Sequence, residues 1–365
     1  MGVVNPTEDN FYSYISGNVV IPDSVEYNGT KYIVGAIGPS AFNGCGGLNS
    51  VSIPEGITSI GGYAFAYCSG LTSITIPDGV ASIGYDAFAY CIGLSSISIP
   101  NSVTFIGHSA FDHCSGLSSV TIGDGVTTIE SYAFFGCSSL TSVIVPASVT
   151  SIGNQVFNGC SSLTSLMVAT GNTHYDSRDE CNAIIQTELN LLVQGCNTTE
   201  IPSTVTAIGN YALQGCIGLN SITIPDGVTS IGEYAFAYCS GLTSVSIGNG
   251  VISINPNTFN QCTSLTYIVI PDGVTSIGGY AFANCSNLTS VIIGNGVTSI
   301  GNGAFYFCSS LTSVHCNPTN PPTLSYNNFG FLSTHIYVSC NSLNAYQNAS
   351  GWNSLASSIH GTWEN

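Results

Sequence analysis

Cysteines recur along this chain at a constant spacing, together with the apolar residues around them. Eleven of them form two series in which neighbours are 23 residues apart. The first series is Cys45, Cys68, Cys91, Cys114, Cys137 and Cys160, and the second is Cys216, Cys239, Cys262, Cys285 and Cys308. A fixed period of this length is typical of repeat solenoids, in which each repeat is one supersecondary unit that stacks on the next.

The first part of each repeat alternates apolar and polar residues. In one representative repeat, Ile74 and Ile76 alternate with Ser73 and Thr75. This period of two predicts a half-buried β-strand that turns its isoleucines inward and its hydroxyl groups outward. Such a strand would expose a polar row on every coil.

The rest of the repeat predicts a turn, a second strand and a short helical turn. Pro-Asp-Gly at 77–79 combines a fixed φ, a side chain that can bond its own backbone and a residue that tolerates positive φ, so it predicts a turn. Residues 80–83 suit a short strand. Ala87, Phe88 and Cys91 have the spacing of one buried helical turn.

A single coil cannot bury its own apolar residues, so stacking must supply the core. With strands about 4.8 Å apart, eleven coils would form a rod about 50 Å long. The predicted fold is therefore a repeat solenoid with a parallel β-sheet along one face and short helical turns on the other side.

The period divides the chain into five parts. Residues 34–168 and 201–316 carry the repeats, and residues 169–200 interrupt them with two apolar stretches around a polar turn, which predicts a β-hairpin insertion. Residues 1–33 and 317–365 have irregular strand-like or helix-like pieces and are expected to cover the first and last coils.

The cysteines outside the two series leave two interpretations open. If the hairpin turns near Glu188, Cys181 lies opposite Cys196, where the two could form a disulfide or pack as free thiols. Cys316 and Cys340 are a second pair with the same alternatives. The repeat cysteines recur at one inward position, which predicts a ladder of packed thiols in the core.

The repeat PDGVTSIGxYAFxxCxxLTSI resembles that of BspA-like leucine-rich-repeat proteins, a class of bacterial surface proteins. The resemblance extends over nearly the whole chain, including the interruption at 174–185 and the ending at 336–352. It implies a leucine-rich-repeat fold, exposure at the cell surface and a binding function. It also implies host matrix or plasma proteins as a class of partner, and it supplies no catalytic residues.

Composition excludes some partners. Two basic residues stand against 19 acidic ones, and the formal charge of −17 leaves too few cations to neutralise nucleic-acid phosphates. The same charge favours the approach of basic partners. No apolar run is long enough to span a bilayer, so we expect no membrane insertion. Residues 1–6 lack the features of a signal peptide, and we expect that one has been replaced there in a secreted or surface protein.

Candidate chemistry is sparse. None of the common catalytic or phosphate-binding motifs is present, so we expect neither enzyme activity nor a cofactor. His108 and His113 flank Asp112, but their spacing does not bring both rings together, and we expect no metal site there. Acidic residues recur in the turns at Asp78, Asp124, Asp226 and Asp272, where turn formation explains them better than calcium binding does.

The outward residues of the first strands are the candidate binding residues. Most are serine or threonine, namely Ser73, Thr75, Ser96, Ser98, Ser119, Thr121, Ser244 and Ser246. Two stretches are apolar instead: Ile144 with Met167, and Tyr267 with Val269 and Ile292. Apolar and aromatic clusters on an exposed face are candidate contact patches for a partner. A tyrosine that recurs before the Ala-Phe pair, as at Tyr63, predicts an aromatic row on another face.

Three functions fit these features. The leading hypothesis is a non-catalytic recognition or adhesion scaffold on the cell surface with a protein or glycan ligand. The alternative is a passive spacer or surface-layer component. A third is the binding of ice or polysaccharide through the Ser/Thr ladder, which includes a second-strand series with Thr58, Thr104 and Thr127.

Overall fold

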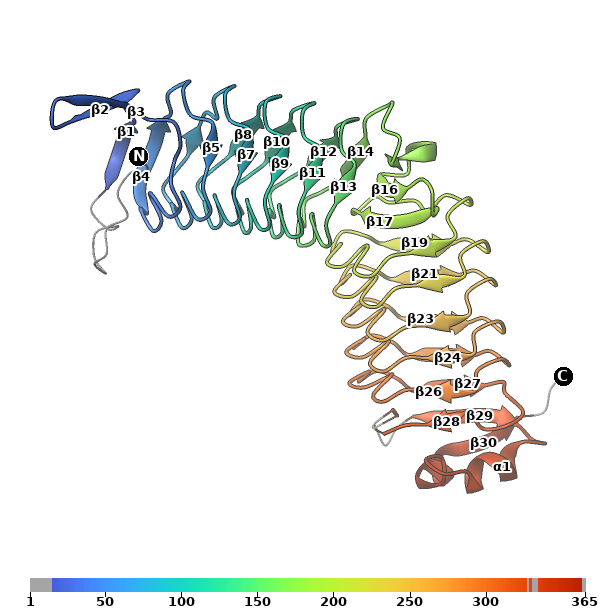
Figure 1. Ribbon diagram of the computed structural model, residues 1–365. Helices are drawn as coiled ribbons and strands as arrows, with labels where there is room; N and C mark the ends of the chain where they lie inside the picture. The colour runs from blue at the N-terminus through green and yellow to red at the C-terminus, as the bar shows by residue number, and fades with distance from the viewer. Residues whose placement is uncertain (1–14, 327, 330–333, 363–365) are drawn as a thin grey trace. The chain divides into compact units, whose positions relative to one another are not determined.

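The computed structural model describes residues 15–326, 328–329 and 334–362 (Figure 1). It contains two compact units, divided between Ser177 and Arg178. Each unit is a parallel β-solenoid whose coils contribute a first strand and a second strand, as the period predicted. Residues 1–14 and 363–365 of the predicted caps lie outside the described residues.

In unit 1 the first strands lie next to one another along one face of the solenoid. They are β1 (Ser16–Val20), β4 (Gly47–Ser52), β6 (Ser73–Ile74), β8 (Ser96–Ile99), β10 (Ser119–Ile122), β12 (Ser142–Val145) and β14 (Ser165–Val168). The second strands form a parallel five-stranded sheet of β5 (Ser59–Ile60), β7 (Ser82–Ile83), β9 (Phe105–Ile106), β11 (Thr128–Ile129) and β13 (Ser151–Ile152). A hairpin of β2 (Ser24–Tyr27) and β3 (Thr30–Ile33) stands at the N-terminal end, and β15 (Tyr175–Asp176) follows β14.

Unit 2 repeats this arrangement. Its first strands are β19 (Ser221–Ile224), β21 (Ser244–Ile247), β23 (Tyr267–Ile270), β25 (Ser290–Ile293), β27 (Ser313–Cys316), β29 (His335–Ser339) and β30 (Ile359–Thr362). The other strands are β16 (Ala183–Gln186), β17 (Leu191–Gly195), β18 (Ala207–Ile208), β20 (Ser230–Ile231), β22 (Ser253–Ile254), β24 (Ser276–Ile277), β26 (Ser299–Ile300) and β28 (Thr323–Leu324). The short helices are η2 (Arg178–Glu180), α1 (Leu343–Asn348) and η3 (Asn353–Ser358).

A ladder of stacked phenylalanines runs through the core of each unit. In unit 1, Phe65, Phe88, Phe111 and Phe134 are fully buried, and neighbouring ring centroids are 5.1 or 5.2 Å apart. Because every coil places the same residue at the same position, each ring packs on the equivalent ring of the next coil. Burial of these repeated side chains supplies the main stabilising free energy of the solenoid.

The helical turns expected opposite the first strands are replaced by runs of tight turns. Within one coil, Ala66 N donates to Tyr63 O, whereas Phe65 N and Tyr67 N donate to carbonyls of the following coil. Tyr63 and Tyr67 have φ values of 55° and 58°. Since alternate N–H groups bond between coils, a continuous helical ladder cannot form. The expectation was wrong because the spacing of Ala, Phe and Cys fits successive turns as well as a helix.

The repeat cysteines are buried and their thiols donate to backbone carbonyls, which confirms the predicted ladder. Cys114 Sγ donates to Phe88 O at 3.1 Å and Cys137 Sγ to Phe111 O at 3.2 Å. The same bond recurs in other coils of both units. Each of these hydrogen bonds links the cysteine of one coil to the backbone carbonyl of a core residue in another coil.

The hairpin of the insertion forms with the predicted register next to its turn, but an irregularity between Ile184 and Ile185 shifts the pairing by one residue toward the cysteines. β16 pairs antiparallel with β17, and Ala183 lies opposite Gly195. Cys181 and Cys196 are therefore not opposite each other, and their thiols donate to the carbonyls of Ala183 and Asn182. β17 also pairs in parallel with β18, so the hairpin continues the second-strand sheet.

The C-terminal part closes unit 2 with additional strands and short helices. β29 and β30 extend the first-strand sheet beyond β27, and α1 and η3 follow. Tyr346 and Trp352 are fully buried, and they donate hydrogen bonds to the carbonyls of Pro318 and Pro322. Cys316 and Cys340 are not joined by a disulfide, and neither are Cys181 and Cys196.

Candidate ligand-binding face

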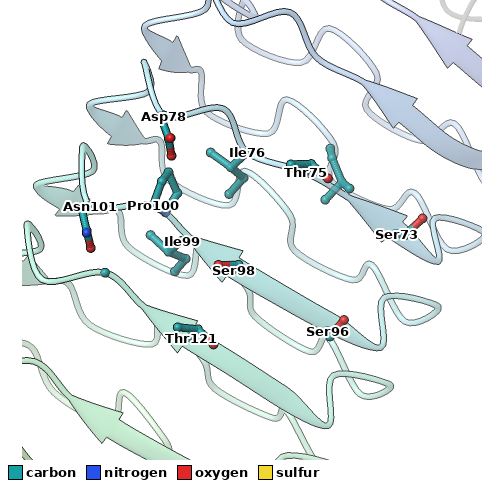
Figure 2. Close-up of a pocket in the computed structure, with 12 residues that line it drawn as sticks. Ser73, Thr75, Ile76, Asp78, Ser96, Ser98, Ile99, Pro100, Asn101 and Thr121 are labelled. Carbon is teal, nitrogen blue, oxygen red and sulfur yellow. The ribbon is translucent and has the colours of Figure 1, made fainter.

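A shallow groove of about 570 Å³ crosses the first strands of unit 1 (Figure 2). Its polar lining comes from Ser73, Thr75, Asp78, Ser96, Ser98, Asn101 and Thr121, and its floor includes Ile74, Ile76, Ile99 and Pro100. Five of these residues, Ser73, Thr75, Ser96, Ser98 and Thr121, are candidates from the sequence, and the structure brings them together. The strand register explains why, because Ser96 lies opposite Ser119 and Ser98 opposite Thr121 on neighbouring coils.

The hydroxyl groups in this groove are available to a ligand. Ser73, Thr75, Ser96, Ser98 and Thr121 are exposed, and their side chains form no hydrogen bond within the part of the chain that the structure describes. A row of hydroxyl groups without internal partners can donate to and accept from a bound molecule.

Other exposed threonines use their hydroxyl groups within the fold. Thr58 Oγ1 donates to Gly35 O at 3.0 Å, and Thr127 Oγ1 donates to Thr104 O at 3.1 Å. The equivalent bond recurs at Thr104, Thr150, Thr229, Thr275 and Thr298. The second-strand series therefore stabilises the stacking of coils, and its hydroxyl hydrogens are not free for a regular lattice such as ice.

Turn residues of both units link neighbouring coils, and one of them also adjoins the groove. Asn101 Oδ1 accepts a hydrogen bond from Asp124 N of the next coil at 2.8 Å, and Asp226 Oδ1 accepts one from Asn249 N at 2.8 Å. Asp272 Oδ1 accepts the equivalent bond from Asn295 N, so the carboxylates of Asp226 and Asp272 link neighbouring coils. Asp78 is exposed beside the groove and contributes a negative charge to it.

Apolar side chains continue the groove along unit 1. Ile144 is 63% exposed and lies opposite the half-buried Met167 on the neighbouring strand. A second hollow of about 310 Å³ is lined by Thr121, Ile144 and Pro146 among others, so Thr121 belongs to both hollows. Hydroxyl groups and an apolar patch thus adjoin on one surface, a combination typical of recognition sites.

Unit 2 has its own apolar patch on the first-strand side. Tyr267 and Val269 are 45% and 40% exposed on β23, and Ile292 lies opposite Val269 on β25. Ser244 and Ser246 are exposed on β21. The two predicted apolar stretches therefore belong to different units, and each adjoins exposed hydroxyl groups of its own unit.

The same column of residues continues into histidines that the sequence analysis missed. Ile292 lies opposite His315, His315 opposite Tyr337, and Tyr337 opposite His360. His315 is on the last regular repeat, and Tyr337 and His360 lie in the cap, where the regular period ends. The alternation of apolar and polar residues over 334–338 was the signal that could have extended the exposed face this far.

An aromatic row occupies the tight-turn side of unit 1. Tyr67, Tyr90 and His113 stack with centroids 4.9 Å apart, and Tyr63 packs edge-on against Tyr85. This stacked row follows the Ala-Phe pair, whereas the predicted row precedes it. Within the predicted series, Tyr211 and Tyr234 stack with centroids 5.2 Å apart, and Tyr63 packs against Tyr85 instead.

The described residues offer little for metal or membrane chemistry. His113 Nδ1 lies 2.7 Å from Asp112 Oδ1, but within these residues no group of three or more His, Cys, Asp or Glu side chains could hold a metal ion. In the same part of the chain, no helix has the length and apolar character needed to cross a bilayer.

Comparisons with known proteins agree with this architecture. A profile of the BspA type leucine-rich-repeat region matches six copies, over residues 35–172, 193–312 and 229–350. A leucine-rich cell surface protein from Faecalibacterium prausnitzii is 30% identical, with a TM-score of 0.66, 92% of this chain covered and 91% of the other. No curated protein matches the chain.

Two further solved structures have related folds. The pneumococcal vaccine antigen PcpA has a TM-score of 0.74 at 20% identity, with 96% of this chain and 88% of that chain covered, so the likeness concerns the fold. A leucine-rich-repeat protein from Bacteroides ovatus has a TM-score of 0.52 at 27% identity, with 85% and 91% covered.

Proposed function

Because the chain belongs to the BspA-type leucine-rich-repeat family, we propose that it is a non-catalytic surface scaffold that binds a protein ligand along its first strands. The observation that carries this proposal is the groove of unit 1, where exposed hydroxyl groups without internal partners adjoin the apolar side chain of Ile144. Polar groups would fix the orientation of the ligand, and apolar contacts would supply affinity.

Charge and surface chemistry indicate the class of ligand. The formal charge of −17 favours a partner with a basic surface and should accelerate association at low salt. Exposed Ile144, Tyr267 and Val269 favour a protein partner, since aromatic and apolar anchors contribute much of the binding energy at protein interfaces. Host extracellular matrix and plasma proteins, together with glycans, are the first ligands to test.

Replacing Tyr267 and Val269 by serine is expected to weaken binding to the partner at least about tenfold, because it removes two adjacent exposed anchors. The measurement is binding of the purified chain to immobilised matrix proteins, plasma proteins and glycans at low and physiological salt. Affinity for a basic protein should fall as salt rises.

The matched control replaces Tyr238 and Tyr280 by serine, since these residues of the same unit are 43% and 41% exposed on its tight-turn side. That variant should bind like the unaltered chain. Equal losses in both variants would contradict recognition through the first strands. The absence of saturable binding across the panel would contradict the proposal and favour the passive spacer.

A further inference from the structure

Three of the six histidines of this chain gather on the exposed face of the last strands of unit 2. His315 belongs to β27, His335 to β29 and His360 to β30, at the C-terminal end of the solenoid (Figure 1). The sequence from 273 to 362 contains no acidic residue, lysine or arginine. The imidazoles and the partly exposed thiol of Cys340 are therefore the metal-binding side chains of this stretch, and no carboxylate within it explains the clustering of the histidines.

Two of the three rings meet through their nitrogen atoms. His335 Nδ1 and His360 Nε2 are 3.0 Å apart, and the ring centroids are 5.1 Å apart with an interplanar angle of 45°. His335 is exposed and His360 is half-buried, so solvent ions can reach the pair. At this distance, one of the two nitrogens donates a hydrogen bond and the other accepts it.

Tyr337 holds these rings in place from the centre of the cluster. Its ring stacks on His315 with centroids 4.9 Å apart and lies 5.7 Å from the ring of His360. Strand pairing sets this order, because Tyr337 lies opposite His315 on one side and His360 on the other. Tyr337 therefore separates His315 from the other two histidines and restricts the orientation of His360.

We propose that His335 and His360 form a two-histidine clamp for a divalent transition-metal ion, bound through Nδ1 of His335 and Nε2 of His360. Two nitrogen ligands of a tetrahedral zinc ion, each about 2.0–2.1 Å from the metal, are about 3.3 Å apart. The observed separation of 3.0 Å is close to that value, so a small opening of the pair admits the ion.

Binding requires a simple change of tautomer. The proton shared between the two nitrogens moves to the other nitrogen of the ring that carried it, and both facing nitrogens then offer lone pairs to the metal. Both imidazoles stay neutral, and no proton is released. Imidazole ligands suit zinc, copper and nickel ions.

The remaining coordination positions are left to water or to a group of a partner. Within the described residues no cluster of three or more candidate ligands exists, and His315 is separated from the pair by the ring of Tyr337. The site is consequently open, in contrast to a closed structural zinc site with four protein ligands. It would be a weak site that a partner's donor group could complete.

Titration of the untagged chain with Zn²⁺ by calorimetry tests the clamp. One ion should bind per chain, and His335→Asn and His360→Asn should each weaken binding at least about tenfold. The double variant should bind Zn²⁺ no more weakly than the weaker-binding of the two single variants. A single remaining imidazole already cannot form the clamp. Circular dichroism verifies that each variant is folded.

Two control variants separate the clamp from nearby alternatives. His315→Asn removes the neighbouring histidine and Cys340→Ser removes the partly exposed thiol, and both should bind Zn²⁺ like the unaltered chain. NMR of the unaltered chain supplies a readout without substitutions, in which Zn²⁺ should shift the signals of two of the six imidazoles. Unchanged affinity in both His→Asn variants, or no shift of any imidazole signal at millimolar Zn²⁺, would overturn the proposal.

Discussion

Replacing Phe111 by alanine is expected to lower the free energy of unfolding by about 3–5 kcal/mol. Phe111 is fully buried and its ring lies 5.1 Å from the rings of both Phe88 and Phe134. The substitution removes contacts on both faces of the ring and leaves a cavity between coils. Urea denaturation followed by circular dichroism measures the change.

The control is the same substitution at Phe105, six positions earlier. Phe105 is 39% exposed on β9, so Phe105→Ala should change the free energy of unfolding by less than about 1 kcal/mol. The two positions share the residue type and lie in the same coil, and they differ in burial and in ring stacking. Similar losses at the two positions would contradict the stacked-phenylalanine core.

Alkaline conditions are expected to destabilise this protein strongly, because many thiols are buried in neutral form. Burial raises the pKa of Cys114 and of Cys239 from the ordinary value of 9.0 to about 12. In the unfolded chain these thiols ionise above pH 9, whereas in the folded chain they remain protonated. The unfolded state therefore loses protons first, and stability falls as pH rises from about 9 toward 12.

The magnitude follows from the difference between the two pKa values, which corresponds to about 4 kcal/mol for each such thiol at pH 12. Below pH 9 the contribution is fully retained. Urea midpoints measured between pH 7 and 11 with reductant present should fall steeply above pH 9. Cys114→Ala should make the slope of the unfolding free energy against pH shallower by the contribution of about one proton. A curve parallel to that of the unaltered chain would contradict the burial of Cys114 as a neutral thiol.

The inward and outward residues of the first strands could be predicted because a period of two assigns them directly. Ile74 and Ile76 are buried and Ser73 and Thr75 are exposed, as the alternation required. Stacking followed from the period as well, because a coil with one buried side needs neighbours. The solenoid fold depended only on these two properties.

The conformation opposite the first strands could not be predicted from spacing. Ala87, Phe88 and Cys91 are buried as expected, yet Phe88 N donates to Ala110 O of the following coil. Hydrogen bonding to a neighbouring coil depends on the distance between coils, which a sequence pattern does not contain. The register of the hairpin failed for a similar reason, since an irregularity between Ile184 and Ile185 shifts the pairing by one residue.

The candidate site was predicted in its residue types but only partly in its extent. Ser73, Thr75, Ser96 and Ser98 do line one groove. A hydroxyl group is available to a ligand only if no backbone carbonyl of a neighbouring coil lies within hydrogen-bonding distance. The second-strand threonines have such a carbonyl and Ser98 does not, which only the three-dimensional structure reveals. The pairing of His335 with His360 was missed because these residues follow the last regular repeat.

The most direct test of the central claim is to block the groove and measure affinity for a partner found in the binding panel. Ser98→Trp fills the middle of the groove in unit 1, whereas Ser→Trp at the exposed Ser69 places the same ring outside it. Recognition along the first strands predicts at least about a tenfold loss of affinity for Ser98→Trp and near-normal binding for the control. Undiminished binding of the folded Ser98→Trp variant to every partner would contradict recognition through this groove.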